Sequence, residues 1–197
     1  MCSARWACGA AAVAIALLAA GCDEVTTESG AADVSGRGSK KVKTEKATFA
    51  AGCFWHVEDA FRRVAGVISA TSGYTGGDVE NPTYDEVCSG ETGHAEAVLV
   101  EYDPARVTYG KLLETFWRIH HASENPPQNR DGRWQYRSAV FYHNAEQREE
   151  ALAKKREMEA AGRAVVTAIV PAGPFYRAEE YHQRYYEKHG YGTCPVS

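Results

Sequence analysis

The chain has 197 residues, of which 44% are hydrophobic and 24% are charged, so it is long enough for one medium-sized domain with a substantial core. Its formal net charge of −4 at pH 7 argues against nucleic acid as a partner, because nucleic-acid binding usually needs a strongly basic surface. The six cysteines include no CxxC pair and show no zinc-finger spacing, so neither a disulfide framework nor a structural zinc site is expected.

The first 21 residues differ from the rest of the chain. Arg5 precedes an uninterrupted apolar run over 10–20, which is too short to span a bilayer and is typical of a signal-peptide core. The run leads into Leu18-Ala19-Ala20-Gly21-Cys22, which resembles the lipobox of bacterial lipoproteins. We therefore expect 1–21 to be a lipoprotein-type signal peptide and Cys22 to be lipidated. An ordinary secretory signal and an uncleaved anchor are the alternatives.

Residues 22–46 are polar and lack hydrophobic periodicity, which predicts a flexible tether before a folded domain over 47–197. Such a chain would be exported and anchored to a membrane through Cys22, on the periplasmic or cell-surface side. The thiols that remain after export are Cys53, Cys88 and Cys194. Three sparse thiols in an oxidising compartment favour redox chemistry over disulfide stapling.

The stretch Gly52-Cys53-Phe54-Trp55 joins a short β-capable run, 47–51, to a segment whose apolar residues fall at helical spacing. Cys53 is therefore expected where a strand turns into a helix, and the helix N-terminus is expected to lower the pKa of its thiol. A thiolate is nucleophilic at neutral pH, and the two aromatic residues supply an apolar wall beside it. The alternative is a cysteine packed as a small hydrophobic residue.

Strands and helices are expected to alternate after this point. The helix that follows Cys53 is expected to end near 65–66, and a strand over 67–72 is expected to be broken by the glycine-rich stretch 73–77. A long connection then runs to residue 90 and contains one short helix. Long connections inside a compact domain are often functional.

Residues 94–102 alternate as a strand and place Glu96 on the same face as Val98 and Val100. A carboxyl group among buried apolar residues has a raised pKa and can remain protonated near neutrality. Glu96 is therefore a candidate proton donor. The alternative is a glutamate at the rim of the sheet, paired with an arginine.

Further helices are predicted over 109–120, 145–161 and 178–188, and further strands over 138–143 and 164–170. Asn144 and Gln147 make a capping box for the second of these helices. His120 and His121 are expected to stabilise a helix C-terminus, because no HExxH-like metal motif is present. The element order contains a split βαβ unit. It predicts an α+β fold, a two-layer α/β sandwich with a mixed sheet and a ferredoxin-like split βαβ core.

A series of short stretches resembles the motifs of one family, in order, from about residue 47 to residue 194. They are Gly52-Cys53-Phe54-Trp55, Gly73-Tyr74-Thr75-Gly76-Gly77, Pro82-Thr83-Tyr84, Glu86-Val87-Cys88-Ser89-Gly90, Thr92-Gly93-His94-Ala95-Glu96, Tyr102-Asp103-Pro104, Gln135-Tyr136-Arg137-Ser138 and Tyr181-His182-Gln183. The family is the peptide methionine sulfoxide reductases of the A type. Each type of this enzyme repairs one epimer of methionine sulfoxide. With no B-type domain in the sequence, reduction of the S epimer alone is expected.

The resemblance implies that Cys53 attacks the sulfoxide sulfur and that Glu96 protonates the sulfoxide oxygen. It also implies an aromatic pocket for the substrate's methyl group and polar side chains that hold the oxygen. The residues that match this substrate site are Phe54, Trp55, Tyr84, Asp131 and Tyr136.

Methionine would then leave, and Cys53 would remain as a sulfenic acid. Cys194 matches the resolving cysteine of the family, on a glycine-rich tail that is expected to be flexible; Cys88 is either structural or a backup thiol. A thioredoxin-like protein or another dithiol would reduce the resulting disulfide. The resemblance implies no bound metal, flavin or nicotinamide. The expected substrates are oxidised proteins or free methionine sulfoxide, and a monomer is expected.

Some positions depart from the family pattern. His56 stands where glycine is usual, and the segment 120–134 differs from the common one, which leaves substrate preference open. No further cysteine follows Cys194, so direct reduction of a Cys53–Cys194 disulfide is expected. Two other classes of function are considered. A thiol peroxidase has no evident need for a protonated Glu96, and a metal-binding lipoprotein would use cysteines and histidines without catalysis.

Overall fold

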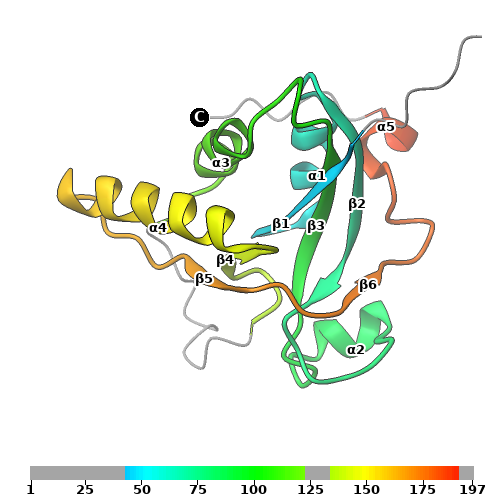
Figure 1. Ribbon diagram of the computed structural model, residues 1–197. Helices are drawn as coiled ribbons and strands as arrows, with labels where there is room; N and C mark the ends of the chain where they lie inside the picture. The colour runs from blue at the N-terminus through cyan, green and yellow to red at the C-terminus, as the bar shows by residue number, and fades with distance from the viewer. Residues whose placement is uncertain (1–42, 123–133, 191–197) are drawn as a thin grey trace, which may run out of the picture. The chain divides into compact units, whose positions relative to one another are not determined.

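The computed structural model describes residues 43–122 and 134–190 (Figure 1). The predicted signal peptide, most of the predicted tether, and Cys22, Asp131 and Cys194 lie outside these ranges. Within them, no helix is both long enough and apolar enough to cross a membrane.

The described residues form one mixed sheet with helices between its strands. In the sheet the strands follow the order β5-β4-β1-β3-β2-β6. Only β4 and β5 pair in parallel, and every other pairing is antiparallel. The elements in chain order are β1 (Glu45–Ala51), α1 (Phe54–Arg62), β2 (Val67–Thr75), α2 (Tyr84–Cys88), β3 (Ala95–Tyr102), α3 (Tyr109–Arg118), β4 (Ser138–Tyr142), α4 (Ala145–Ala160), β5 (Ala168–Pro171), β6 (Phe175–Arg177) and α5 (Tyr185–His189).

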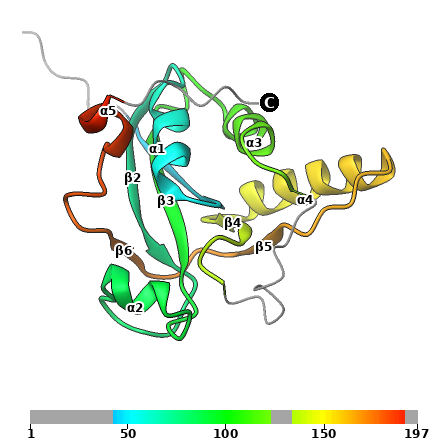
Figure 2. The same cartoon turned by 180° about the vertical axis from the view of Figure 1, so that it is seen from behind.

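The predicted split βαβ unit is present. Helix α1 connects β1 to β2, and β3 lies between these two strands and runs antiparallel to both. Helix α1 packs across β1, β2 and β3, while α3 packs against β1 and contacts both α1 and α4 (Figures 1 and 2). The predicted α+β fold with a mixed sheet is therefore confirmed.

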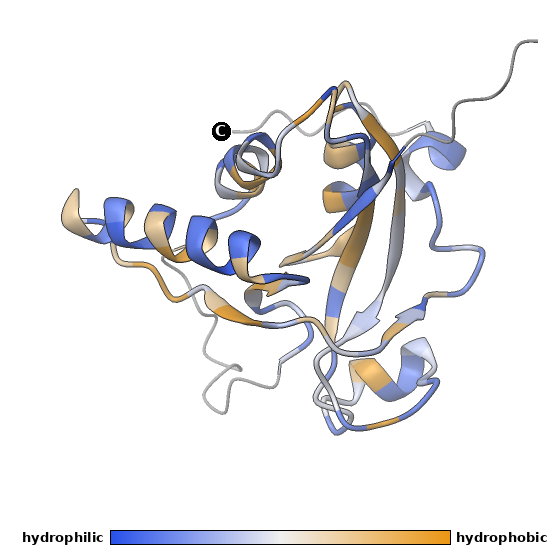
Figure 3. Ribbon diagram, in the orientation of Figure 1, coloured by the Kyte–Doolittle hydropathy of each residue, from blue (hydrophilic) through white to orange (hydrophobic). Residues whose placement is uncertain are grey.

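The core holds α1 against the sheet. The ring of Phe49 on β1 stacks on Phe61 of α1 at 4.9 Å and on Phe116 of α3 at 5.3 Å between centroids. All three rings are fully buried. Burying each ring stabilises the fold by roughly 1.5–3 kcal/mol. Apolar residues of β1, β3 and α1 lie where these elements meet (Figure 3). Cys53 therefore stands between the buried end of β1 and the beginning of a helix that packs on the sheet.

The predicted break after residue 72 is wrong. Gly73, Tyr74 and Thr75 continue β2, where they pair with β6. A Cβ atom on Gly73 would lie 2.4 Å from both the Tyr176 carbonyl oxygen and the Phe175 ring. Glycine is thus required here for the close approach of another strand, and the short strand β6 was not predicted at all.

The predicted helix over 178–188 is wrong in its first half, because only Tyr185–His189 is helical. Arg184 has a left-handed backbone with φ of +55°, and its N–H donates to both carboxylate oxygens of Glu58, at 3.0 and 2.9 Å. The side chain of Gln183 donates to the carbonyl oxygens of Ser72 and Ala178. Tertiary hydrogen bonds have replaced helical ones in this segment.

Other predicted boundaries shift by a few residues. Helix α1 ends at Arg62 and α3 at Arg118, both before the predicted ends, and β5 begins at Ala168 instead of 164. Asn144 caps α4 by accepting from the Gln147 N–H at 2.8 Å, as predicted. In a capping box the Gln147 side chain would also accept from the Asn144 N–H. Here it instead accepts from the His143 N–H and donates to the Lys46 carbonyl oxygen.

Candidate active site

The thiol of Cys53 lies at the turn from β1 into α1, as predicted. Gly52 has φ of +87°, a conformation that glycine adopts without strain, and Cys53 is the extended N-cap residue of α1. The Cys53 side chain is partly buried and forms no disulfide within the part of the chain that the structure describes. The backbone N–H groups of Trp55 and His56 point toward its sulfur and favour the thiolate.

The predicted lowering of the Cys53 pKa is wrong. Burial, followed by the nearby carboxylate of Glu96, raises the pKa of the Cys53 thiol to about 11 and outweighs the backbone N–H groups that lower it. Desolvation disfavours the charged form of any group, and a neighbouring negative charge adds to that effect. In the protein without substrate, Cys53 is therefore a thiol at neutral pH, and its activation requires a change in its surroundings.

Glu96 is a buried acid, as predicted. Its side chain on β3 is 1% exposed, and its Oε2 accepts a hydrogen bond from the Phe54 N–H at 3.0 Å. Burial raises its pKa to about 7, although the hydrogen bonds from Phe54 and from the Tyr136 hydroxyl oppose this rise. Its burial rules out the alternative of an exposed rim glutamate. Glu96 can carry a proton at neutral pH and release it to a bound group.

Two tyrosine hydroxyls join Glu96 in the same cluster. The Tyr136 side chain is hydrogen-bonded to Glu96 and to Tyr84, and the Tyr84 hydroxyl is hydrogen-bonded to the thiol of Cys88. Burial, followed by the charges of Glu96 and then Cys53, raises the pKa of Tyr136. Both hydroxyls thus keep their protons and can donate to an oxygen atom placed near Glu96.

Aromatic rings form the other side of the site. Phe54 is buried, and Trp55 stacks on Tyr185 with 3.7 Å between centroids and an interplanar angle of 5°. The indole N–H of Trp55 donates to His182 Nδ1 at 3.0 Å. No role was predicted for His182, although the Tyr181-His182-Gln183 motif that contains it was a signal. The structure places its ring between Phe54, Trp55 and Tyr84.

Two histidines lie beside this cluster. The ring of His56 is hydrogen-bonded to the backbone carbonyl groups of Cys53 and Ile119, and burial lowers its pKa. His120 Nδ1 contacts the Phe116 carbonyl oxygen at 2.7 Å, so it caps the last turn of α3, but burial lowers its pKa to about 4. His120 therefore stabilises the helix end as a neutral ring. Among 43–122 and 134–190, no three His, Cys, Asp or Glu side chains gather as a metal site.

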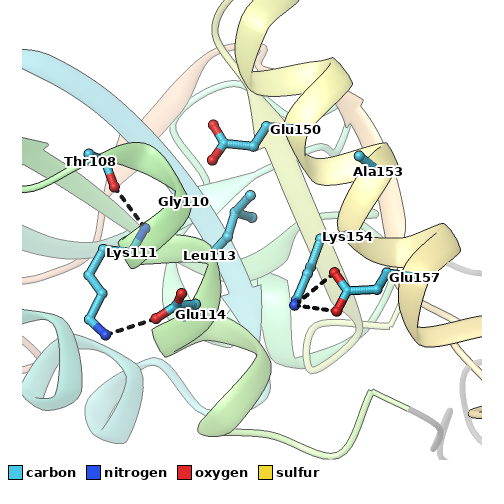
Figure 4. A pocket seen from close by; sticks show the side chains of 9 residues that line it. All are labelled: Thr108, Gly110, Lys111, Leu113, Glu114, Glu150, Ala153, Lys154 and Glu157. Carbon is cyan, nitrogen blue, oxygen red and sulfur yellow. Dashed lines mark hydrogen bonds and ion pairs between the residues drawn. The ribbon is translucent and has the colours of Figure 1, made fainter. Parts of the chain in front are cut away.

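A separate groove of about 420 Å³ lies between α3 and α4 (Figure 4). Ion pairs of Lys111 with Glu114 and of Lys154 with Glu157 line its sides. The Glu150 carboxylate approaches Gly110, where a Cβ atom would lie 2.3 Å from it. None of the predicted site residues that the structure describes lines this groove.

The thiol, the buried acid and the two hydroxyls together define a site for thiol chemistry on an oxygen-bearing group, next to an aromatic wall. A family model described as "Peptide methionine sulfoxide reductase" matches residues 45–197. The peptide methionine sulfoxide reductase MsrA of Methanoculleus marisnigri is 57% identical over 153 residues, which are 76% of this chain and 93% of that protein.

Solved structures agree with these sequence matches. The crystal structure of reduced Mxr1 from Saccharomyces cerevisiae matches with a TM-score of 0.70 and 33% identity, over 79% of this chain and 92% of that one. The structure of Mxr1 in complex with Trx2 matches with a TM-score of 0.53 and 26% identity, over 79% and 89% of the two chains. The chain belongs to the peptide methionine sulfoxide reductase family. It is an oxidoreductase, as the motifs predicted.

Proposed function

We propose that this protein reduces methionine S-sulfoxide, free or in proteins, to methionine, with Cys53 as the nucleophile and Glu96 as the proton donor. The observation that carries the proposal is the buried carboxyl group of Glu96, held by the Phe54 N–H at 3.0 Å, with a pKa of about 7 and in electrostatic contact with Cys53. A sulfoxide has a poor leaving group until its oxygen is protonated. An acid that keeps its proton at pH 7 supplies that proton.

In the proposed reaction the substrate's methyl group packs against Phe54 and Trp55, and the sulfoxide oxygen accepts hydrogen bonds from the hydroxyls of Tyr84 and Tyr136. Asp131 is a further polar residue of this site. The Cys53 sulfur attacks the sulfoxide sulfur while Glu96 protonates the oxygen. The proton that the thiol gives up returns to Glu96, so a high resting pKa of Cys53 does not prevent the reaction. The protonated oxygen leaves as water, so that the Cys53 sulfur is bonded to the methionine sulfur. Water then attacks the Cys53 sulfur, the bond between the two sulfurs breaks, methionine leaves with that electron pair, and Cys53 becomes a sulfenic acid.

A second thiol then completes the cycle. We propose that Cys194 condenses with the sulfenic acid, which releases water and forms a Cys53–Cys194 disulfide. A dithiol of the thioredoxin type would reduce this disulfide by exchange, and the complex of the relative Mxr1 with Trx2 supports such a partner. Cys88 is hydrogen-bonded to Tyr84 and would act only as a backup thiol.

The first experiment follows the loss of each epimer of free methionine sulfoxide with dithiothreitol as reductant. We expect the parent to consume the S epimer only, Cys53→Ser to be inactive, and Glu96→Gln to be slower by about 10²–10⁴ because general acid catalysis is lost. Cys88→Ser and Glu101→Gln are matched controls, the second on the same strand, and both should remain active. Consumption of neither epimer, or a Glu96→Gln variant as fast as the parent, would contradict the proposal.

We further propose that residues 1–21 are a lipoprotein signal peptide, that Cys22 is lipidated, and that 22–46 tether a monomeric domain, 47–197, to the outer side of a membrane. The apolar run over 10–20 and the lipobox-like Leu18-Ala19-Ala20-Gly21-Cys22 support this. Metabolic labelling with a palmitate analogue should label the parent chain in a bacterial host and not Cys22→Ala. Equal labelling of both chains, or of neither, would contradict lipidation at this position.

A further inference from the structure

His182 occupies the centre of the aromatic side of the site. Its side chain is 1% exposed, and its ring centroid lies 5.0 Å from that of Phe54, 5.8 Å from Trp55 and 4.4 Å from Tyr84. Tyr181 covers it at 4.1 Å. Three residues proposed to bind the substrate therefore contact one buried imidazole that is itself absent from the proposed chemistry.

The hydrogen bond from Trp55 fixes the tautomer of His182. An indole nitrogen can only donate, so His182 Nδ1 must accept and Nε2 must carry the ring proton. Nε2 has no hydrogen-bond partner among the described residues and lies 3.9 Å from Glu179 Oε2. The carboxylate therefore attracts the Nε2 proton without a direct hydrogen bond. Burial lowers the pKa of His182, and this keeps the ring neutral.

Glu179 connects the His182 imidazole to the side of the site that carries the tyrosine hydroxyls. Its carboxylate accepts from the Tyr74 hydroxyl at 2.8 Å and from the Tyr84 N–H at 2.9 Å. The first residue of α2, which carries one of the proposed oxygen-binding hydroxyls, is thus fixed to the same group that orients His182. His182 and Glu179 therefore connect the aromatic side of the site to the side that carries the hydroxyls.

The indole of Trp55 is consequently held on two sides. The Tyr185 ring lies on its face at 3.7 Å, and His182 Nδ1 fixes its edge at 3.0 Å. Stacking alone permits the indole to slide and rotate in its plane, whereas a hydrogen bond at Nε1 defines its orientation. The position of the wall that faces the substrate's methyl group depends on that bond.

We propose that His182, as the neutral Nε2–H tautomer, is a positioning residue for the substrate: it orients the Trp55 indole and thereby sets the affinity of the site for the methyl group of methionine sulfoxide. This inference rests on the proposed function. It concerns substrate binding and not proton transfer, so its effect falls on KM and leaves the chemical step at saturating substrate largely unchanged.

A double-mutant cycle tests the inference. His182→Phe keeps the ring bulk but leaves the buried indole N–H without an acceptor, so KM for methionine S-sulfoxide should rise by about tenfold. The same change in a Trp55→Phe background, which has no indole N–H, should raise KM by less than about twofold further. His182→Asn, whose Oδ1 can occupy the place of Nδ1, should recover most of the parent KM. The exposed His121→Phe is the matched control and should behave as the parent.

The outcomes separate this inference from the reaction itself. Equal effects of His182→Phe in the two backgrounds, or a fall in kcat with unchanged KM, would overturn it. The inference would also be overturned if His182→Asn is folded by circular dichroism but its KM for methionine S-sulfoxide is as high as that of His182→Phe. If the parent chain does not consume methionine S-sulfoxide, the proposed function fails, and this inference falls with it.

Discussion

Two buried carboxyl groups, one on α1 and one in contact with its first residue, behave differently. Glu58 and Glu96 are both 1% exposed, and burial raises the pKa of each. Glu58 belongs to α1 itself and contacts the segment that leads into α5, whereas Glu96 belongs to β3 and contacts the first residue of α1. Equal burial therefore does not give them equal roles.

The difference lies in their partners. The Glu58 carboxylate accepts from the Ser72 hydroxyl at 3.0 Å and from the Arg184 N–H through both oxygens. The positive charges of Arg62 and Lys188 further favour its ionised form. These groups oppose the effect of burial and make Glu58 an anchor for the segment before α5.

Glu96 has fewer groups that stabilise its charge. It accepts from the Phe54 N–H and from the Tyr136 hydroxyl, and among the described residues no positive charge contributes to its pKa of about 7. The comparison indicates that donors and nearby cations favour the ionised form of Glu58 more than that of Glu96.

The largest effect on stability is expected for Glu96→Gln, as a function of pH. The pKa of Glu96 is raised to about 7 in the folded protein, against roughly 4.3 in the unfolded chain. Its contribution to stability is therefore complete below the unfolded value and is lost as pH rises through 7. Glutamine cannot ionise. The variant should thus match the parent near pH 4 and exceed its unfolding free energy by about 4 kcal/mol at pH 9.

Urea unfolding of both chains across this pH range checks that expectation, with Glu101→Gln, on the same strand, as the control for the effect of the substitution itself. A constant difference between parent and Glu96→Gln at pH 4 and pH 9 would show that Glu96 is not a proton carrier. Together with the loss of activity expected for the same variant, a gain of stability at high pH would mark Glu96 as a residue kept for chemistry at a cost in stability.

The local features of the site could be predicted from the sequence. The turn from strand to helix at Cys53 follows from the change in hydrophobic period, and the burial of Glu96 follows from its alternation with Val98 and Val100. These features depend on residues that are close together in the chain. They could be read without knowledge of the tertiary structure.

The features that were missed depend on distant residues. Burial, followed by Glu96, raises the pKa of Cys53, and the two effects together outweigh that of the local helix terminus. The start of α5 is delayed because Arg184 binds Glu58, 126 residues earlier in the chain. His182 acquired its place in the site through a partner on α1, Trp55. Tertiary packing overrode local propensity in each case.

A smaller effect on stability, in the opposite direction, is expected for Glu58→Gln. The Arg184 N–H donates to both carboxylate oxygens of Glu58. Glutamine keeps one of these acceptor oxygens and replaces the other with an NH₂ group, which cannot accept. The unfolding free energy at pH 7 should fall by roughly 1–3 kcal/mol, because a buried donor loses part of its acceptor. Since Glu58 touches no group proposed to react, kcat for methionine S-sulfoxide should change little.

Urea unfolding and single-turnover kinetics on the same Glu58→Gln protein separate the two effects. Loss of stability with retained turnover is expected, which is the reverse of Glu96→Gln at high pH, where stability rises and turnover falls. If Glu58→Gln instead lost turnover and kept its stability, the distinction between an anchoring and a proton-carrying carboxyl group would be wrong. The count of donors around a buried acid would then be no guide to its role in this protein.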